Sequence, residues 1–157
     1  MIFIFYADLL KACLDGDNML TLRPLKESDI TDKYVNWWKS KKFTKYLETK
    51  KLNKQDAINH LRSVQQNGGF LCAVEVDGVH VGNVKVNNGD LSIIIFPPFW
   101  GHGYATVAIN KMAKAIGGYI TAGVRSGNVA SLRAFEKAGF TITGKKQDIT
   151  YLAINLN

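Results

Sequence analysis

The alternation of apolar and polar residues along the chain predicts seven strands and four helices. Alternation with a period of two, or a short β-branched run, indicates a strand, and apolar residues spaced three and four apart indicate a helix. The expected strands are 19–23, 70–76, 79–86, 90–96, 119–124, 140–143 and 149–154. Two helices fall between the first two strands, one follows residue 103, and one follows residue 127. The order β-α-α-β-β-β-α-β-α-β-β predicts an α/β fold, a mixed sheet with helices on its faces.

Residues that favour turns mark two hairpins within this pattern. Asp77-Gly78 and Asn88-Gly89 each join two strands with the two-residue signal typical of a tight hairpin. Between these turns the valines change from one face of the strand to the other. We therefore expect a β-bulge at Gly82-Asn83, where this change occurs.

The ends of the helices are marked by capping residues. Ser28 or Asp29 can cap the first helix, Asn53 the second and Asn128 the fourth, since each has a side-chain oxygen that accepts from a backbone amide. The third helix is expected to end at Gly117-Gly118.

The stretch from residue 93 to residue 105 joins a buried strand to a helix through a glycine-rich loop. The strand Ile93–Ile95 must stop before Pro97-Pro98, because proline has no N–H group for the ladder. Gly101-His102-Gly103 then leads directly into a helix from Tyr104. Backbone donors at a helix start, together with the helix dipole, suit an anion. The pattern favours a phosphate-binding loop, and a plain tight turn is the alternative.

Composition narrows the class of protein. The chain has 157 residues, 46% of them hydrophobic, which suits one soluble domain with a sizeable core. No apolar run is long enough to cross a bilayer, so we expect no membrane association. Cys13 and Cys72 stand apart from each other and from any histidine spacing, so we expect no metal site and a reducing, cytoplasmic location. The net charge of +7 favours anionic partners, but no nucleic-acid-binding module accompanies it.

Two segments resemble a known family. The segment Trp100–Thr106 resembles the acetyl-CoA pyrophosphate loop of the GNAT N-acetyltransferases, with Gly103 and Ala105 at the family's small positions. The segment Asn128–Phe140 resembles the family's fourth helix. The resemblance is closest to the branch of the ribosomal-protein N-terminal and bacterial amino-sugar acetyltransferases. It covers residues 19–157, which we expect to form a single domain, and leaves 1–18 as an extension of uncertain structure.

The resemblance implies acetyl-CoA as cosubstrate, with no metal. Backbone groups of the central strand would hold the pantetheine and polarise the acetyl carbonyl, the loop would hold the pyrophosphate, and the start of the fourth helix would complete the site. The residues implied are Ile94, Ile95, Phe96, Gly101, His102, Gly103, Tyr104, Ala105, Thr106, Asn128 and Ser131.

Transfer of an acetyl group requires an acid for the leaving thiolate. Many members of the family use a tyrosine, but Phe135 stands at its place here and has no proton to give. Ser131 matches a family serine near the thiol, so we expect Ser131 or water to supply the proton.

Transfer also requires a neutral amine. At pH 7 an α-amino group with a pKa near 8 is about a tenth neutral, whereas a lysine amine is about one part in two thousand. A modest base is therefore sufficient for a weakly basic amine. Asp90, at the start of the central strand, is the expected catalytic base, with Asp148 and Glu75 as alternatives. His80 and His102 are of the residue type that can exchange a proton near neutral pH, and His102, within the loop, is expected to be a neighbour of the phosphate and not the base.

The acceptor is expected to be the amine of a nucleotide-linked amino sugar. Tyr46 and Glu48, in the loop 43–52, resemble residues of amino-sugar acetyltransferases and are the expected substrate-binding pair. A protein or peptide N-terminus is the alternative acceptor. A non-catalytic protein of this fold that binds CoA or nucleic acid is the alternative outside the enzymes. The sequence leaves open whether the protein is a monomer or a homo-oligomer.

Overall fold

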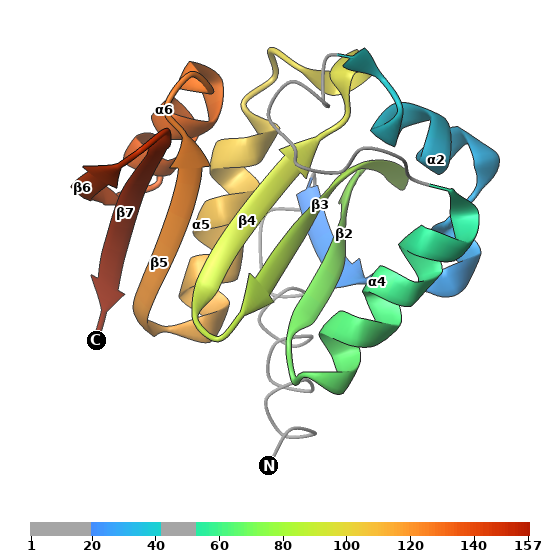
Figure 1. Ribbon diagram of the computed structural model, residues 1–157, viewed down its shortest axis with the longest axis horizontal. Coiled ribbons are helices and arrows are strands. Elements are labelled where there is room, and N and C mark those ends of the chain that lie inside the picture. Colours follow the sequence, from blue (N-terminus) through green and yellow to red (C-terminus); the bar gives the residue numbers. More distant parts are fainter. Residues whose placement is uncertain (1–19, 42–52) are drawn as a thin grey trace.

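Seven strands form one mixed sheet in the order β1-β2-β3-β4-β5-β7-β6 (Figure 1). The computed structural model describes residues 20–41 and 53–157. All neighbouring strands are antiparallel except β4 and β5, which are parallel. The strands are β1 (Leu20–Pro24), β2 (Phe70–Val76), β3 (Val79–Asn87), β4 (Asp90–Ile95), β5 (Gly118–Arg125), β6 (Thr141–Lys146) and β7 (Ile149–Leu156). The predicted α/β fold and the order of its elements are confirmed.

The four predicted helices are present among the described residues. They are α2 (Asp32–Trp38), α4 (Lys54–Gln66), α5 (Tyr104–Ile116) and α6 (Val129–Lys137), with two short 3₁₀ turns, η1 (Glu27–Asp29) and η2 (Pro97–Phe99). The caps predicted at Asn53 and Asn128 are confirmed, since each accepts a hydrogen bond from the backbone of its helix.

The predicted cap of the first helix is wrong. Neither Ser28 nor Asp29 caps it, because both lie in η1, and Thr31 caps α2 by accepting from the Tyr34 amide at 3.2 Å. The Asp29 carboxylate instead accepts from Arg23 at 2.7 and 2.8 Å and from the Lys26 amide at 2.7 Å. Arg23 on β1 therefore binds the Asp29 carboxylate that was predicted to cap the first helix.

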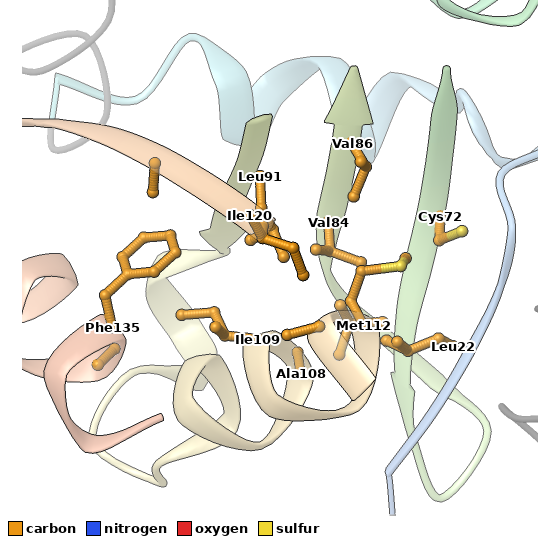
Figure 2. Close-up of a cluster of buried hydrophobic side chains, with 14 of the residues drawn as sticks. Leu22, Cys72, Val84, Val86, Leu91, Ala108, Ile109, Met112, Ile120 and Phe135 are labelled. Atoms are coloured by element: carbon orange, nitrogen blue, oxygen red, sulfur yellow. The ribbon is translucent and has the colours of Figure 1, made fainter. Parts of the chain in front are cut away.

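The helices cover both faces of the sheet. Residues of α5 and α6 pack on one face with alternate residues of β2, such as Cys72 and Val74. Residues of α2 and α4 pack on the other face with Leu71 and Ala73. Figure 1 shows α5 behind β4 and β5, and Figure 2 shows Ala108, Ile109 and Met112 of α5 facing the side chains of the sheet. This face holds the larger of the two apolar clusters. Within the described residues, no helix is long and apolar enough to span a membrane.

Both predicted hairpin turns are confirmed, and the predicted bulge lies one residue away from its expected position. Asp77 and Asn88 have φ values of 49° and 51° and are each followed by a glycine with positive φ, as a tight hairpin turn requires. Across β2 and β3, Val74 faces Gly82 while Glu75 faces His80, so Val81 is the extra residue. The bulge turns both Val81 and Val84 into the core, where they are 1% and 0% exposed.

Gly82 marks a close approach of two backbones. A Cβ atom on Gly82 would lie 2.1 Å from the carbonyl oxygen of Ile94 on β4, well inside contact distance. The φ angle of Gly82 is not positive, so the absence of a side chain, and not backbone freedom, explains the glycine. Gly123 of β5 provides a contrast, because its Cβ would meet only side-chain atoms, at 3.4 Å or more.

We predict that Gly82→Ala lowers the free energy of unfolding by about 2–3 kcal/mol, because the new methyl group must displace the backbone of β4. Gly123→Ala is the matched control and should change stability by no more than about 0.5 kcal/mol, since it adds the same methyl group where there is room. Urea denaturation of the three proteins measures both values. Equal losses in the two variants would contradict the prediction.

Candidate active site

β4 and β5 part where they approach their carboxyl ends. Their pairing is confined to Asp90 with Thr121, at the beginning of β4. On its other side β4 stays paired with β3 as far as Ile95 with Gly82. We call the end of the sheet where β4 and β5 terminate the carboxyl end. An opening between parallel strands at this end is the usual place for a ligand in an α/β sheet.

The backbone of β4 alternates between its two neighbours. The Phe96 amide donates to the Val81 carbonyl at 2.8 Å, so Phe96 turns toward β3. In an antiparallel ladder every second residue turns the same way, and the residues between turn their backbone groups to the opposite side. The Ile95 amide is therefore directed toward the opening beside β5, whereas those of Ile94 and Phe96 are directed toward β3.

The loop between β4 and α5 is anchored on β4. The Trp100 indole Nε1 donates to the Ile95 carbonyl at 2.7 Å, and the Phe99 amide donates to the Phe96 carbonyl at 2.9 Å. These bonds fix the chain before it enters the exposed residues Gly101 and His102. Trp100 thus bonds the loop to the central strand.

The first turn of α5 has no side-chain cap. Its N-cap residue, Gly103, has φ 75° and no side chain to accept from the amides of the first turn. The other three helices in the described ranges, α2, α4 and α6, are capped by Thr31, Asn53 and Asn128. Space around Gly103 is open, since a Cβ placed there would meet no atom within 4 Å. The start of α5 therefore presents backbone donors and the positive end of a helix dipole to a ligand.

The start of α6 lies at the same end of the sheet, because β4 and β5 run in the same direction (Figure 1). Asn128 Oδ1 accepts from the Ser131 amide at 3.3 Å, and Ser131 is half-buried. The Ser131 hydroxyl forms no hydrogen bond within the described part of the chain. Phe135 is 2% exposed and packs edge-on against Phe140, so it belongs to the core.

The three carboxylates considered as bases are distributed over the domain. Asp90 lies at the far end of β4, about 17 Å of extended strand from Ile95, and accepts from the Thr121 hydroxyl at 2.8 Å. Asp148 is 69% exposed and lies 3.5 Å from Arg125. Glu75 is ion-paired with Arg23 at 2.7 Å.

The ion pairs of Arg23 hold β1, β2 and η1 together. Arg23 binds Asp29 and Glu75, each at 2.7 Å. Burial would raise the pKa of Asp29, but the hydrogen bonds from Arg23 and from the Lys26 amide outweigh it and lower the pKa below its ordinary value. The Asp29 carboxylate is thus held as an anion, and the same guanidinium binds Glu75.

A polar cluster near the carboxyl end was not recognised from the sequence as a unit. Asn83 is 3% exposed, and its amide group donates to the Tyr34 hydroxyl at 2.9 Å while its Oδ1 lies 2.8 Å from His80 Nε2. Burial raises the pKa of Tyr34, against the hydrogen bond from Asn83 that lowers it. An asparagine inside a run of valines is the sequence signal that could have indicated the cluster.

Tyr46 and Glu48, the expected substrate-binding pair, lie outside the described residues. So do the N-terminal residues 1–18. Among the described residues, no group of three or more His, Cys, Asp or Glu could hold a metal ion.

Comparison with known proteins identifies the fold. A search of the curated protein sequences returns no significant match. Among solved structures, the spermidine N-acetyltransferase of Vibrio cholerae, in complex with CoA and spermine, superposes with a TM-score of 0.76 at 20% identity, over 88% of this chain and 96% of the other. An aminoglycoside acetyltransferase with CoA and kanamycin gives 0.74 at 14%, over 87% and 94%. The alpha-N-protein acetyltransferase RimL with CoA gives 0.78 at 15%, over 89% and 96%.

The model of the acetyltransferase (GNAT) domain family matches residues 19–141. This match includes β4, the loop before α5, and α6, which are the elements that surround the opening in the sheet. The chain therefore belongs to the GNAT acetyltransferases and is an acetyl-CoA-dependent N-acetyltransferase.

Proposed function

We propose that this acetyltransferase holds acetyl-CoA between β4 and β5, with the pyrophosphate at Gly101–Thr106, and transfers the acetyl group to a nucleotide-linked amino sugar. The observation that carries the cofactor placement is the uncapped start of α5 next to the point where β4 and β5 part. The exposed Gly101 and His102 and the open space at Gly103 allow phosphate oxygens to approach the backbone closely.

The Ile95 amide is the proposed donor to the acetyl carbonyl. An oxyanion-type donor must point at the position where negative charge develops during attack on the thioester. Of the three backbone groups expected to contact the cofactor, the Phe96 amide is already bonded to Val81. Ile94 turns in the same direction as Phe96, so Ile95 is the residue of the three whose amide faces the opening.

Ser131 is the proposed acid for the thiolate of CoA. Its amide is held by Asn128, which fixes the residue in the first turn of α6, and its hydroxyl has no partner among the described residues. Phe135 is enclosed in the core and cannot take this role. Water is the alternative proton donor.

Charge favours a nucleotide-linked acceptor. The chain carries a net charge of +7, which attracts a diphosphate and repels a polycation such as the spermine bound by the Vibrio enzyme. The kanamycin complex of a similar fold is a precedent for an amino-sugar amine as ligand. Tyr46 and Glu48 remain the proposed contacts with the sugar. The cysteine usage leaves a cytoplasmic location as a prediction.

A protein N-terminus is the second candidate acceptor. The similarity to RimL favours it. The low pKa of an α-amino group also favours it, because about a tenth of such groups are already neutral at pH 7.

We predict that CoA raises the melting temperature of the protein, since a ligand bound only to the native state adds about 2.7 kcal/mol at a hundredfold excess over its dissociation constant. Gly103→Val should abolish this shift because its side chain enters the open space in front of the loop. Gly89→Val is the matched control: Gly89 has the same φ of 75° but lies in the β3–β4 turn, at the opposite end of the sheet. Both variants should lose about 1–3 kcal/mol of stability to backbone strain. A wild-type melting temperature unaffected by millimolar CoA would refute the cofactor site.

Ser131→Ala should reduce the maximal rate about a hundredfold while leaving the CoA-dependent melting shift unchanged, because it removes a proton donor and no CoA contact of the loop. Ser63→Ala, which makes the same change on the exposed surface of α4, is the control. Steady-state kinetics at saturating acetyl-CoA measure the difference. Full turnover by Ser131→Ala would assign the proton to water.

To test the acceptor, the protein is incubated with acetyl-CoA and each of four amines, and the products are identified by mass. The four amines are a nucleotide-linked amino sugar, the same amino sugar without its nucleotide, a peptide with a free N-terminus, and spermidine. We expect at least about a tenfold preference in kcat/KM for the nucleotide-linked sugar, equivalent to ~1.4 kcal/mol. Added salt should reduce this preference, because it screens the attraction of the diphosphate. Efficient acetylation of the peptide alone would replace the sugar by a protein N-terminus.

A further inference from the structure

The buried Asn83 fixes the orientation of His80. Its Oδ1 lies 2.8 Å from His80 Nε2, and its amide nitrogen donates to the Tyr34 hydroxyl at 2.9 Å. The Tyr34 ring stacks on the imidazole with ring centres 5.9 Å apart. Asn83 and Tyr34 are 3% and 5% exposed, whereas His80 is half-buried. Two buried residues thus hold one partly accessible imidazole.

This arrangement determines which nitrogen of His80 carries the proton. An amide oxygen only accepts hydrogen bonds, so the Nε2 atom that meets Asn83 Oδ1 must be the donor. In the neutral ring the lone pair is then on Nδ1. Within residues 20–41 and 53–157, Nδ1 forms no hydrogen bond. A base whose tautomer is set by a buried third residue is the arrangement by which proteins prepare an imidazole to accept a proton.

His80 lies beside β4 at the carboxyl end of the sheet. β3 runs antiparallel to β4, so the start of β3 is at the carboxyl end of the sheet. The imidazole packs edge-on against Phe96, with ring centres 5.3 Å apart. Phe96 directly follows Ile95, the proposed donor to the acetyl carbonyl.

Charged groups from three neighbouring elements lie around His80. Glu75 on β2 is its partner across the strand pair, and attraction between His80 and Asp29 of η1 is among the causes that lower the pKa of Asp29. Arg23 of β1 is ion-paired with both carboxylates. Within the described part of the chain, Tyr34 of α2 is a further titratable neighbour, and burial raises its pKa.

We propose that His80 is the general base that deprotonates the acceptor amine, and that Asn83 and Tyr34 are its positioning residues. This inference rests on the proposed function of the site. Nδ1 takes a proton from the acceptor ammonium, and the neutral amine forms a bond to the thioester carbon. The C–S bond then breaks, and the thiolate leaves with the electron pair and is protonated by Ser131 or water. The attacking nitrogen loses its second proton as the amide forms, which restores the Ser131 hydroxyl or the water that protonated the thiolate. The imidazolium returns the first proton to water.

The test compares His80→Gln with the wild type across pH, using whichever amine of the panel is acetylated best. Glutamine keeps an N–H for Asn83 Oδ1 but cannot titrate. Near pH 7 the variant should lose about a hundredfold in kcat/KM. At about pH 9.5, where an amine with a pKa near 8 is already neutral, the loss should shrink to a few fold. A loss of the same size at every pH would indicate a structural role and overturn the proposal, as would no loss.

Two further variants are compared in the same assay. His60→Gln, which makes the same substitution on the exposed surface of α4, should behave as the wild type. Asp90→Asn tests the carboxylate expected from the sequence and should leave the pH profile unchanged. If the pH-dependent loss occurs in Asp90→Asn and not in His80→Gln, the base is Asp90 and the proposal is wrong.

A measurement independent of activity separates this inference from the proposed function. The ¹⁵N chemical shifts of His80 in the intact protein should show the Nε2–H tautomer at a pH where the ring is neutral. An Nδ1–H tautomer overturns the role of His80 even if no amine of the panel is acetylated. A protein with the expected tautomer that binds CoA but acetylates none of the amines would instead refute the proposed acceptor.

Discussion

The contact between the backbones of β3 and β4 at Gly82 is the constraint on which the site depends. With no side chain at Gly82, the Ile94 carbonyl can lie where a Cβ atom would otherwise be, and the two strands remain paired to their end. β4 therefore follows β3 as far as Phe96, although its pairing with β5 stops at Asp90 and Thr121. The opening between β4 and β5 is the consequence of a central strand that stays with one neighbour and leaves the other.

Features set by neighbouring residues could be predicted from the sequence, because their causes are local. Asp77-Gly78 and Asn88-Gly89 specify turns through positive φ values, which few other residues adopt easily. α5 occupies the predicted Tyr104–Ile116 because glycines stand immediately before and after it. The loop that precedes it is local in the same sense, because its proposed phosphate site consists of backbone amides in one short stretch of the chain.

Features that depend on distant partners could not be predicted in the same way. Asp29 is a good cap by type, but Arg23 holds its carboxylate, so the cap falls to Thr31. The Tyr34 hydroxyl meets Asn83 across 49 positions of the sequence. His80 was recognised from its residue type alone, but its contacts with the buried Asn83 and with Tyr34 become visible only when α2 lies on the sheet.

β4 connects the two halves of the proposed chemistry. Because backbone groups alternate along β4, Ile95 is directed toward the opening while Phe96 is bonded to β3, the strand that holds His80. Trp37 of α2 stacks on Phe96 with ring centres 4.3 Å apart, so aromatic rings pack around the end of β4 on the face of the sheet that α2 covers. A shift of β4 would displace the donor to the acetyl group and the surroundings of the base together. Strand pairing and packed rings keep the distance between Ile95 and His80 more constant than a loop could. The rigidity of β4 is therefore a requirement of acetyl transfer in this protein as much as of its stability.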